Sequence, residues 1–293
     1  MTAPDEIIDL ELEYSSGGVS RRPFVLARAK GATLWDAQGN EYIDCSASHG
    51  WANVGHSHPV VTRAIQKQAG VFVACHEGAY TEQRALWMRD LAAITPGNLN
   101  RIHPSNSGAE AVEAAIKAAR YFTGRPNIIA AKRGFHGRTF GAMSATWNKA
   151  YKEPFKPLTP GFSHAAYNNL EAMAAAINEQ TAAVLLEVVQ GEGGVHVGDP
   201  AYFAGVRQLC NERGALLVFD EIQTGFGRTG KLFAAEHLSI LPDMMTLGKG
   251  LGGGIPMGAT VWREELGTLK PGTHGSTFGG NPLACAASRA VMQ

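Results

Sequence analysis

From residue 100 onward, the chain shows two patterns of hydrophobic and polar positions in turn. Short apolar runs typical of buried strands are followed by longer segments with helical spacing. We expect strands over 101–105, 127–132, 182–189, 215–220, 244–247 and 258–262, and helices over 108–122, 170–179 and 202–212. This order predicts an α/β fold with a mostly parallel sheet of about seven strands, sandwiched by helices. Ligands of such sheets bind beyond the carboxyl ends of the strands.

The two ends of the chain show other patterns. Residues 1–30 are polar and read as an arm, 32–36 and 41–45 as a hairpin, and 59–74 and 80–93 as helices. A final helix starts at the cap Asn281 and Pro282, and it ends with no glycine or polar tail, which predicts a C-terminally truncated sequence. We therefore expect an arm and part of a small domain over 1–50, a large ligand-binding domain over 51–280 and a connecting helix over 281–293.

Two charged residues stand at the ends of predicted strands. The apolar run 215–219 ends in Asp220, with Gln223 shortly after it, and another apolar run leads to Lys249 and the glycine cluster 250–254. An acid that keeps a pyridine nitrogen protonated and a lysine that forms a Schiff base are what pyridoxal phosphate (PLP) chemistry requires. The pair predicts a PLP-dependent aminotransferase.

The glycine cluster also matches a dinucleotide-binding pattern. Residues 248–253 read G-x-G-x-x-G, but that fingerprint requires a helix to begin at the glycines. Gly254 and Pro256 follow instead, and both disfavour a helix there. The pattern does not predict nicotinamide binding.

Further candidate ligand contacts follow the other strands. Ser107 precedes the N–H groups of Gly108 and Ala109 at a helix N-terminus, an arrangement that suits a phosphate as well as an ordinary serine cap. Phe135 is placed to cover a flat ring, and Arg138 to bind a carboxylate through two hydrogen bonds. His136, beside Phe135, reads as a structural residue.

Two loop segments are glycine-rich. Glu192, between Gly191 and Gly193, reads either as a substrate contact or as a solvated loop acid. Ser276 and Thr277 lie in the segment 274–281, where two hydroxyls among glycines suit a phosphate oxygen. His56 and His58 have no third ligand near them, so we expect no metal site.

Composition narrows the class of protein. Lys plus Arg and Asp plus Glu both number 26, so the net charge indicates neither a nucleic-acid nor a membrane partner. The four cysteines show no C-x-x-C spacing and read as reduced thiols of a cytoplasmic protein. No signal peptide or membrane-spanning stretch is expected.

Six segments in order resemble the class III (omega-amino-acid) aminotransferases of PLP fold type I, in particular the acetylornithine and carrier-protein-bound lysine aminotransferase branch. These segments are 106–111, 134–139, 190–194, 220–230, 249–254 and 274–282. The likeness covers roughly residues 15–293 and implies a C-terminal half of the small domain beyond them. It also implies small-molecule amino acid and 2-oxo acid substrates, and a homodimer with composite active sites.

The resemblance implies a role for each candidate residue. Lys249 would hold PLP and move the proton, and Asp220 would pair with the pyridinium nitrogen. Gln223 would bind the ring hydroxyl and Phe135 would stack on the ring. The phosphate would be bound by Ser107, Gly108 and Ala109, with Thr277 from the partner subunit. The substrate would meet Arg138, Glu192 and Ser276, with Arg138 taking the carboxylate of glutamate or 2-oxoglutarate.

The expected reaction transfers the terminal amino group of N-acetylornithine, or of a similar blocked diamino acid such as carrier-bound lysine, to 2-oxoglutarate. It gives a semialdehyde and glutamate in arginine or lysine biosynthesis. The alternatives are a 4-aminobutyrate-type transaminase and an inactive truncated remnant. Two departures from relatives occur at Glu187-Val188-Val189 and at Gly248, and the bulk of Ser48-His49-Gly50-Trp51 leaves the amino donor open.

Overall fold

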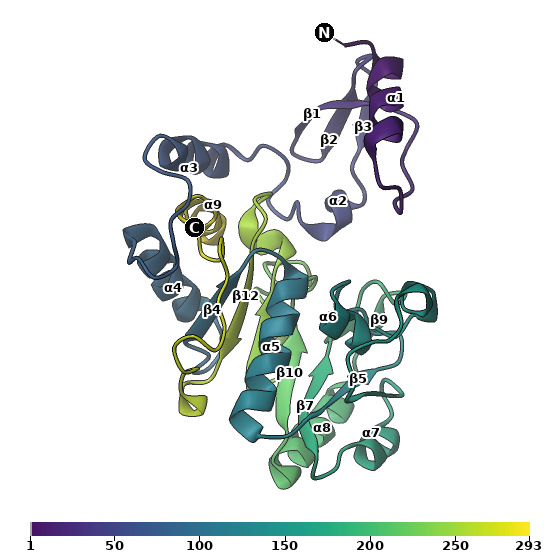
Figure 1. Cartoon of the computed structure of the whole chain (residues 1–293), viewed down its shortest axis with the longest axis vertical. Helices are drawn as coiled ribbons and strands as arrows, with labels where there is room; N and C mark the ends of the chain where they lie inside the picture. Colours follow the sequence, from purple (N-terminus) through teal and green to yellow (C-terminus); the bar gives the residue numbers. More distant parts are fainter. Residues whose placement is uncertain (1) are drawn as a thin grey trace.

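The computed structural model describes residues 2–293 and is built around a seven-stranded sheet (Figure 1). The strand order is β4-β12-β11-β10-β7-β5-β6. The strands are β4 (Arg101–Ser105), β5 (Asn127–Ala131), β6 (Phe162–Ala165), β7 (Thr181–Leu186), β10 (Leu216–Asp220), β11 (Met244–Leu247) and β12 (Gly258–Trp262). Only β12 runs antiparallel to its neighbours, and the other pairs are parallel. The predicted mostly parallel sheet of about seven strands is confirmed.

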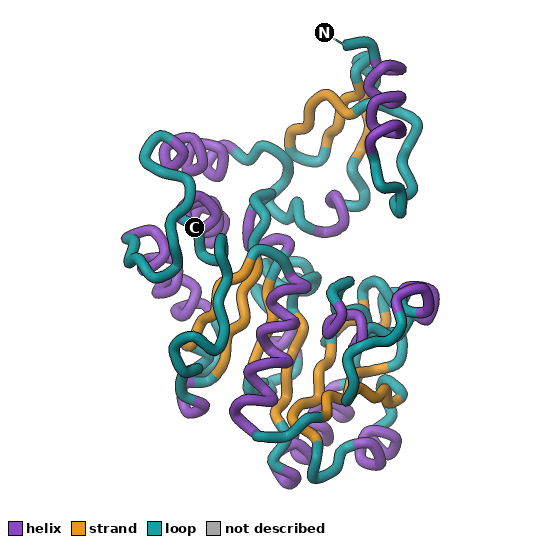
Figure 2. The backbone as a smooth tube through the Cα atoms, viewed as in Figure 1, coloured by secondary structure: helices purple, strands orange, loops and turns teal. Residues whose placement is uncertain are grey.

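Helices cover both faces of this sheet (Figure 2). The α-helices of residues 2–293 are α1 (Pro4–Tyr14), α2 (Ala47–Gly50), α3 (Pro59–Ala69), α4 (Glu82–Ile94), α5 (Gly108–Thr123), α6 (Phe140–Ala145), α7 (Leu170–Ala176), α8 (Pro200–Arg213) and α9 (Pro282–Met292). The short 3-10 helices are η1 (Lys149–Tyr151), η2 (Glu153–Phe155), η3 (Ala234–His237), η4 (Lys249–Gly252) and η5 (Glu264–Leu266).

Successive residues of the central strands enter different cores. Leu216 and Val218 of β10 pack in the cluster that holds the apolar side of α5, whereas Leu217 and Phe219 pack in the cluster that holds α8. Side chains of a strand point alternately to the two faces of the sheet, which produces this division. Both faces of the sheet are buried at β10. The sheet edge that carries the strand ends is therefore the place left for polar chemistry.

The N-terminal segment forms a separate small sheet at one end of the long axis (Figure 1). β1 (Leu26–Lys30), β2 (Thr33–Asp36) and β3 (Glu41–Ile43) are antiparallel in that order. The predicted hairpin corresponds to β2 and β3. The arm differs from the prediction, because it contains the helix α1, begun by Pro4, and the strand β1.

The last helix packs beside two early ones. α9 contacts both α3 and α4, and Trp87 Nε1 of α4 donates a buried hydrogen bond of 2.9 Å to Ser288 Oγ of α9. At the surface, Arg289 pairs with Asp90 at 2.7 Å. The expected domain limits at residues 50 and 280 stay predictions.

Candidate active site

Strand register brings three charged residues to one edge of the sheet. Asp220, the last residue of β10, is paired with Thr246 of β11, so the Lys249 turn begins just beyond it. Phe219 is paired with Leu186 of β7, which places Glu187 beside the same strand end. Residues far apart in the chain thus meet because parallel strands end at a common edge.

A cavity of about 280 Å³ opens at this edge. It brings together most of the residues selected from the sequence. Its lining includes Gly108, Ala109, Phe135, Arg138, Glu192, Asp220, Gln223 and Lys249, together with His136 and Glu187. Among residues 2–293 no cluster of three or more His, Cys, Asp or Glu side chains is arranged to hold a metal ion.

Asp220 is held by a buried histidine. His136 Nδ1 donates a 2.7 Å hydrogen bond to Asp220 Oδ2, and both side chains are almost completely buried. The Ile222 N–H donates to Asp220 Oδ1 at 3.1 Å. Burial disfavours charge on His136, but the bond to Asp220 outweighs it and raises the pKa of the imidazole. The pair fixes the position of the Asp220 carboxyl group in the lining of the cavity.

Glu187 is a second buried acid, and sequence reasoning gave it no role. It accepts a 3.0 Å hydrogen bond from the Phe135 N–H, and only 6% of the residue is exposed. Burial raises the pKa of Glu187 to about 7, although the nearby His136 opposes the shift. An acid inside an apolar run is the sequence signal that would have identified it.

Lys249 is the first residue of η4, and only Gly248 separates it from the end of β11. Its φ of 45° is left-handed, a conformation that is costly for a residue with a side chain and that clusters at functional sites. Burial lowers the pKa of the Lys249 amine, although the charges of Asp220 and Glu187 oppose that shift. Burial thus favours the neutral, nucleophilic form of the amine.

The N-terminus of α5 borders the cavity. Ser107 Oγ accepts a hydrogen bond from the Glu110 N–H at 3.2 Å, so this hydroxyl serves as the helix cap. Glu110 in turn accepts from the Asn106 N–H at 2.7 Å. Gly108 and Ala109 line the cavity, and the first N–H groups of a helix have no acceptor inside it. These two residues can therefore bind an anion while Ser107 shapes the turn.

Gln223 is packed against two loops. A Cβ atom added to Gly191 would overlap Gln223 Oε1, so a larger residue at this position would require the Gln223 side chain to move. A Cβ on Gly50 would be 3.7 Å from Gln223 Nε2 and 3.9 Å from Lys249 Cδ. The bulky segment 48–51 noted in the sequence thus borders the predicted lysine.

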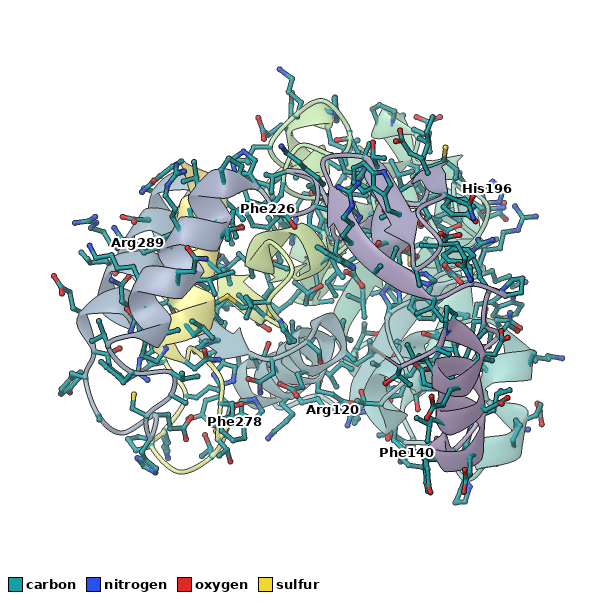
Figure 3. All side chains as sticks on the ribbon, turned by 90° about the horizontal axis from the view of Figure 1, so that it is seen from above. Arg120, Phe140, His196, Phe226, Phe278 and Arg289 are labelled. Atoms are coloured by element: carbon teal, nitrogen blue, oxygen red, sulfur yellow. The ribbon has the colours of Figure 1, made fainter. Side chains whose placement is uncertain are left out.

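Ser276 and Thr277 do not join this group. They line another cavity, beside His103 and Asn106, and that cavity shares no lining residue with the one around Lys249. The neighbouring Phe278 is 60% exposed at the periphery of the molecule (Figure 3). Within one subunit, the two hydroxyl residues belong to a surface distinct from the lysine cavity.

The chain was compared with known proteins. The aminotransferase class-III family matches residues 14–293. Acetylornithine aminotransferase of Methanopyrus kandleri is 49% identical over 98% of this chain and 73% of its own length. The LysW-aminoadipate semialdehyde transaminase of Deinococcus radiodurans is 44% identical over 99% of this chain and 68% of its own length.

Solved structures of aminotransferases are also similar to this chain. Ornithine aminotransferase from Toxoplasma gondii, described with partial PLP occupancy at its active site, superposes with a TM-score of 0.94 at 36% identity. The match covers 98% of this chain and 70% of that one. Acetylornithine aminotransferase from Elizabethkingia anophelis gives a TM-score of 0.84 at 32% identity, covering 99% and 73% of the two chains. The chain therefore belongs to the class-III aminotransferases, a family of PLP-dependent transaminases.

Proposed function

We propose that this transaminase moves the terminal amino group of N-acetylornithine, or of a similarly blocked diamino acid such as carrier-bound lysine, to 2-oxoglutarate. The observation that carries the proposal is the meeting of Lys249 and Asp220 in one cavity, in a chain 49% identical to an acetylornithine aminotransferase. The 44% identical LysW-aminoadipate semialdehyde transaminase supports the wider class of blocked donors.

The cavity residues fit PLP. A half-buried amine, a carboxylate fixed by His136, a flat aromatic side chain and a helix N-terminus line one space. In our proposal Gly108 and Ala109 bind the phosphate through their N–H groups, and Phe135 covers the ring. Gln223 donates its amide hydrogen to the ring hydroxyl.

Four side chains would then act on the cofactor or on the substrate. When bound, PLP accepts the electron pair left on carbon after a proton departs. Asp220, which is held by His136, would keep a proton on the pyridine nitrogen of bound PLP. Lys249 Nζ takes the proton from the substrate carbon that bears the amino group. Arg138 would bind a substrate carboxylate, and Glu192, on the exposed turn, would contact the donor.

We also propose that the enzyme is a homodimer with composite sites. The support is the position of Ser276 and Thr277, which line a cavity apart from Lys249. In a two-fold dimer the same residues can complete the partner's site, with Thr277 binding phosphate and Ser276 contacting substrate. Cytoplasmic localisation stays a prediction; no helix of residues 2–293 has the length and apolarity to cross a bilayer.

Steady-state kinetics with a panel of amino donors test the function. With 2-oxoglutarate as acceptor, we expect N-acetylornithine to give a higher kcat/KM than ornithine or 4-aminobutyrate. A preference for 4-aminobutyrate would replace the proposal by the other type of transaminase. Absence of glutamate formation from any donor, in protein shown to hold PLP, would identify an inactive remnant.

A further inference from the structure

The guanidinium of Arg138 is held by aromatic rings alone. Its Cζ atom lies 3.6 Å from the ring centroid of Tyr151 and 5.6 Å from that of Phe135. No carboxylate of residues 2–293 lies within ion-pair distance of Arg138, and its side chain donates no hydrogen bond there. All of its N–H donors are therefore available to a ligand in the cavity that Arg138 lines.

Tyr151 is itself fixed by local structure. It ends the 3-10 helix η1, which begins after Asn148, whose Oδ1 accepts a 3.0 Å hydrogen bond from the Ala150 N–H. The Tyr151 ring meets Phe135 edge-on, with the two planes at 89° and the centroids 6.0 Å apart. The ring thus has one edge partner, and the guanidinium lies over it.

The ring stands at the junction of two cavities. Tyr151 lines a second cavity with Lys149 and Arg133, while Phe135 and Glu192 line both that cavity and the one around Lys249. Arg138 is an exposed residue, and a long exposed side chain samples many rotamers unless a contact restrains it. A stacked guanidinium loses that freedom before a ligand arrives, which lowers the entropic cost of binding.

We propose that Tyr151 is a positioning residue for substrate specificity: its ring orients the Arg138 guanidinium toward the carboxylate of the substrate. The inference rests on the proposed function, in which Arg138 takes that carboxylate. The stacking requires the face of an aromatic ring and no hydroxyl group. Phenylalanine should therefore replace Tyr151, and leucine, which is apolar but smaller and has no π face, should not.

A binding measurement tests the positioning role without any turnover. Calorimetry on the PLP-loaded enzyme with glutarate, a five-carbon dicarboxylate that cannot be transaminated, gives the dissociation constant. We expect Tyr151→Phe to match the unchanged enzyme and Tyr151→Leu to weaken glutarate binding roughly twofold to fivefold, the effect of one cation–π contact at an exposed site. In an Arg138→Ala background, Tyr151→Leu should have no further effect.

Kinetics then separate positioning from a general structural effect. Tyr151→Leu should raise KM for N-acetylornithine with kcat unchanged. It should leave KM for N-acetyl-1,4-diaminobutane, the same donor without its carboxylate, unchanged. Unaltered melting temperatures of the variants serve as the folding control.

Several results would overturn the proposal. The proposal is wrong if Tyr151→Leu binds glutarate as tightly as the unchanged enzyme, or if Tyr151→Phe loses as much affinity as Tyr151→Leu. It is also wrong if Tyr151→Leu weakens glutarate binding by the same factor in the Arg138→Ala background. Absence of glutarate binding to the unchanged enzyme would overturn it as well. Failure of transamination by the unchanged enzyme would refute the proposed function instead, and the calorimetry would still decide the role of Tyr151.

Discussion

Three carboxylates surround the amine of Lys249, and each is held differently. Asp220 is fixed by the buried His136. Glu187 is buried and accepts a hydrogen bond from the Phe135 N–H, whereas Glu192 is exposed on a turn. At Glu187 and Lys249 burial and the neighbouring charges shift the pKa in opposite directions, so the protonation of these two groups depends on packing. Substitutions that keep shape and change only charge are therefore the sharpest tests at this scale.

Asp220→Asn should lower turnover far more than it lowers PLP affinity. The amide keeps the size of the side chain but cannot hold a proton on the pyridine nitrogen, so a main electrostatic contribution of about 3–4 kcal/mol is lost. Turnover under saturating donor and the PLP dissociation constant by fluorescence check this. Near wild-type turnover in this variant would refute the role of Asp220.

Glu187 makes folding stability depend on pH. Its pKa is raised from 4.5 to about 7 by burial, so the folded protein binds this proton more tightly than the unfolded chain. The stabilisation is complete below pH 4.5 and is lost as the pH rises through about 7. The shift sets an upper limit of roughly 3 kcal/mol on the change in the free energy of unfolding.

Glu187→Gln should flatten this dependence, because the amide still accepts from the Phe135 N–H and carries no charge. Urea unfolding at several pH values between 4.5 and 7, without added PLP, measures the free energy of unfolding. Glu192→Gln, on the exposed turn, is the matched control and should keep the wild-type slope. Identical slopes for Glu187→Gln and wild type would show that Glu187 is not the titrating group.

At the scale of elements, strands with continuous apolar runs could be predicted and weaker ones could not. β10 and β11 are buried on both faces, so both are continuous apolar runs that could be predicted as strands. Their ends then placed Asp220 and Lys249. β6 was missed because its four residues, at the sheet edge, include Ser163 and His164. β1 is mostly exposed and basic, and α1 buries no residue, so neither carries a strong burial pattern.

In the site, too, features set by neighbouring residues could be predicted from the sequence, and contacts between distant segments could not. The cap Ser107 and the glycine turn that places Glu192 follow from neighbouring residues. The bond between His136 and Asp220 joins the loop after β5 to the end of β10, and no residue near His136 in the sequence predicts it. The stacking of Arg138 on Tyr151 likewise depends on how η1 packs on the loop after β5.

The turn between β8 (Val189–Gln190) and β9 (His196–Val197) offers a test at this scale. Gly191→Ala should displace Gln223, because the new Cβ overlaps Gln223 Oε1, and should weaken PLP binding without unfolding the protein. Gln223→Ala removes that overlap, so Gly191→Ala should add little to the loss in the Gln223→Ala background. Equilibrium PLP titration of the four proteins measures this coupling, and purely additive losses would contradict it.

At the scale of the whole molecule, the separation of Thr277 from Lys249 is the observation that supports the proposed dimer with composite sites. The two residues line different cavities of one subunit, and Phe278 beside Thr277 is exposed. If the sites are composite, each lysine cavity borders the Thr277 loop of a partner. This geometry makes a prediction that mixing of subunits can test.

Lys249→Ala and Thr277→Ala subunits, each impaired alone, should complement each other when mixed and reassociated. In the mixed dimer one site combines both substitutions, and the other regains the native lysine and the native threonine. PLP affinity and turnover of the purified mixed dimer check this. Absence of recovery, with mixed dimers demonstrated by differential tags, would place Thr277 in its own subunit's site.

The central claim is that this cavity performs PLP-dependent amino transfer with Lys249. The most direct measurement is the half-reaction of the PLP-loaded enzyme with N-acetylornithine and no oxo acid. We predict semialdehyde in an amount stoichiometric with active sites, followed by glutamate only when 2-oxoglutarate is added, and neither product from Lys249→Ala. A wild-type enzyme that forms no semialdehyde, or a Lys249→Ala variant that forms it at the wild-type rate, would contradict the account.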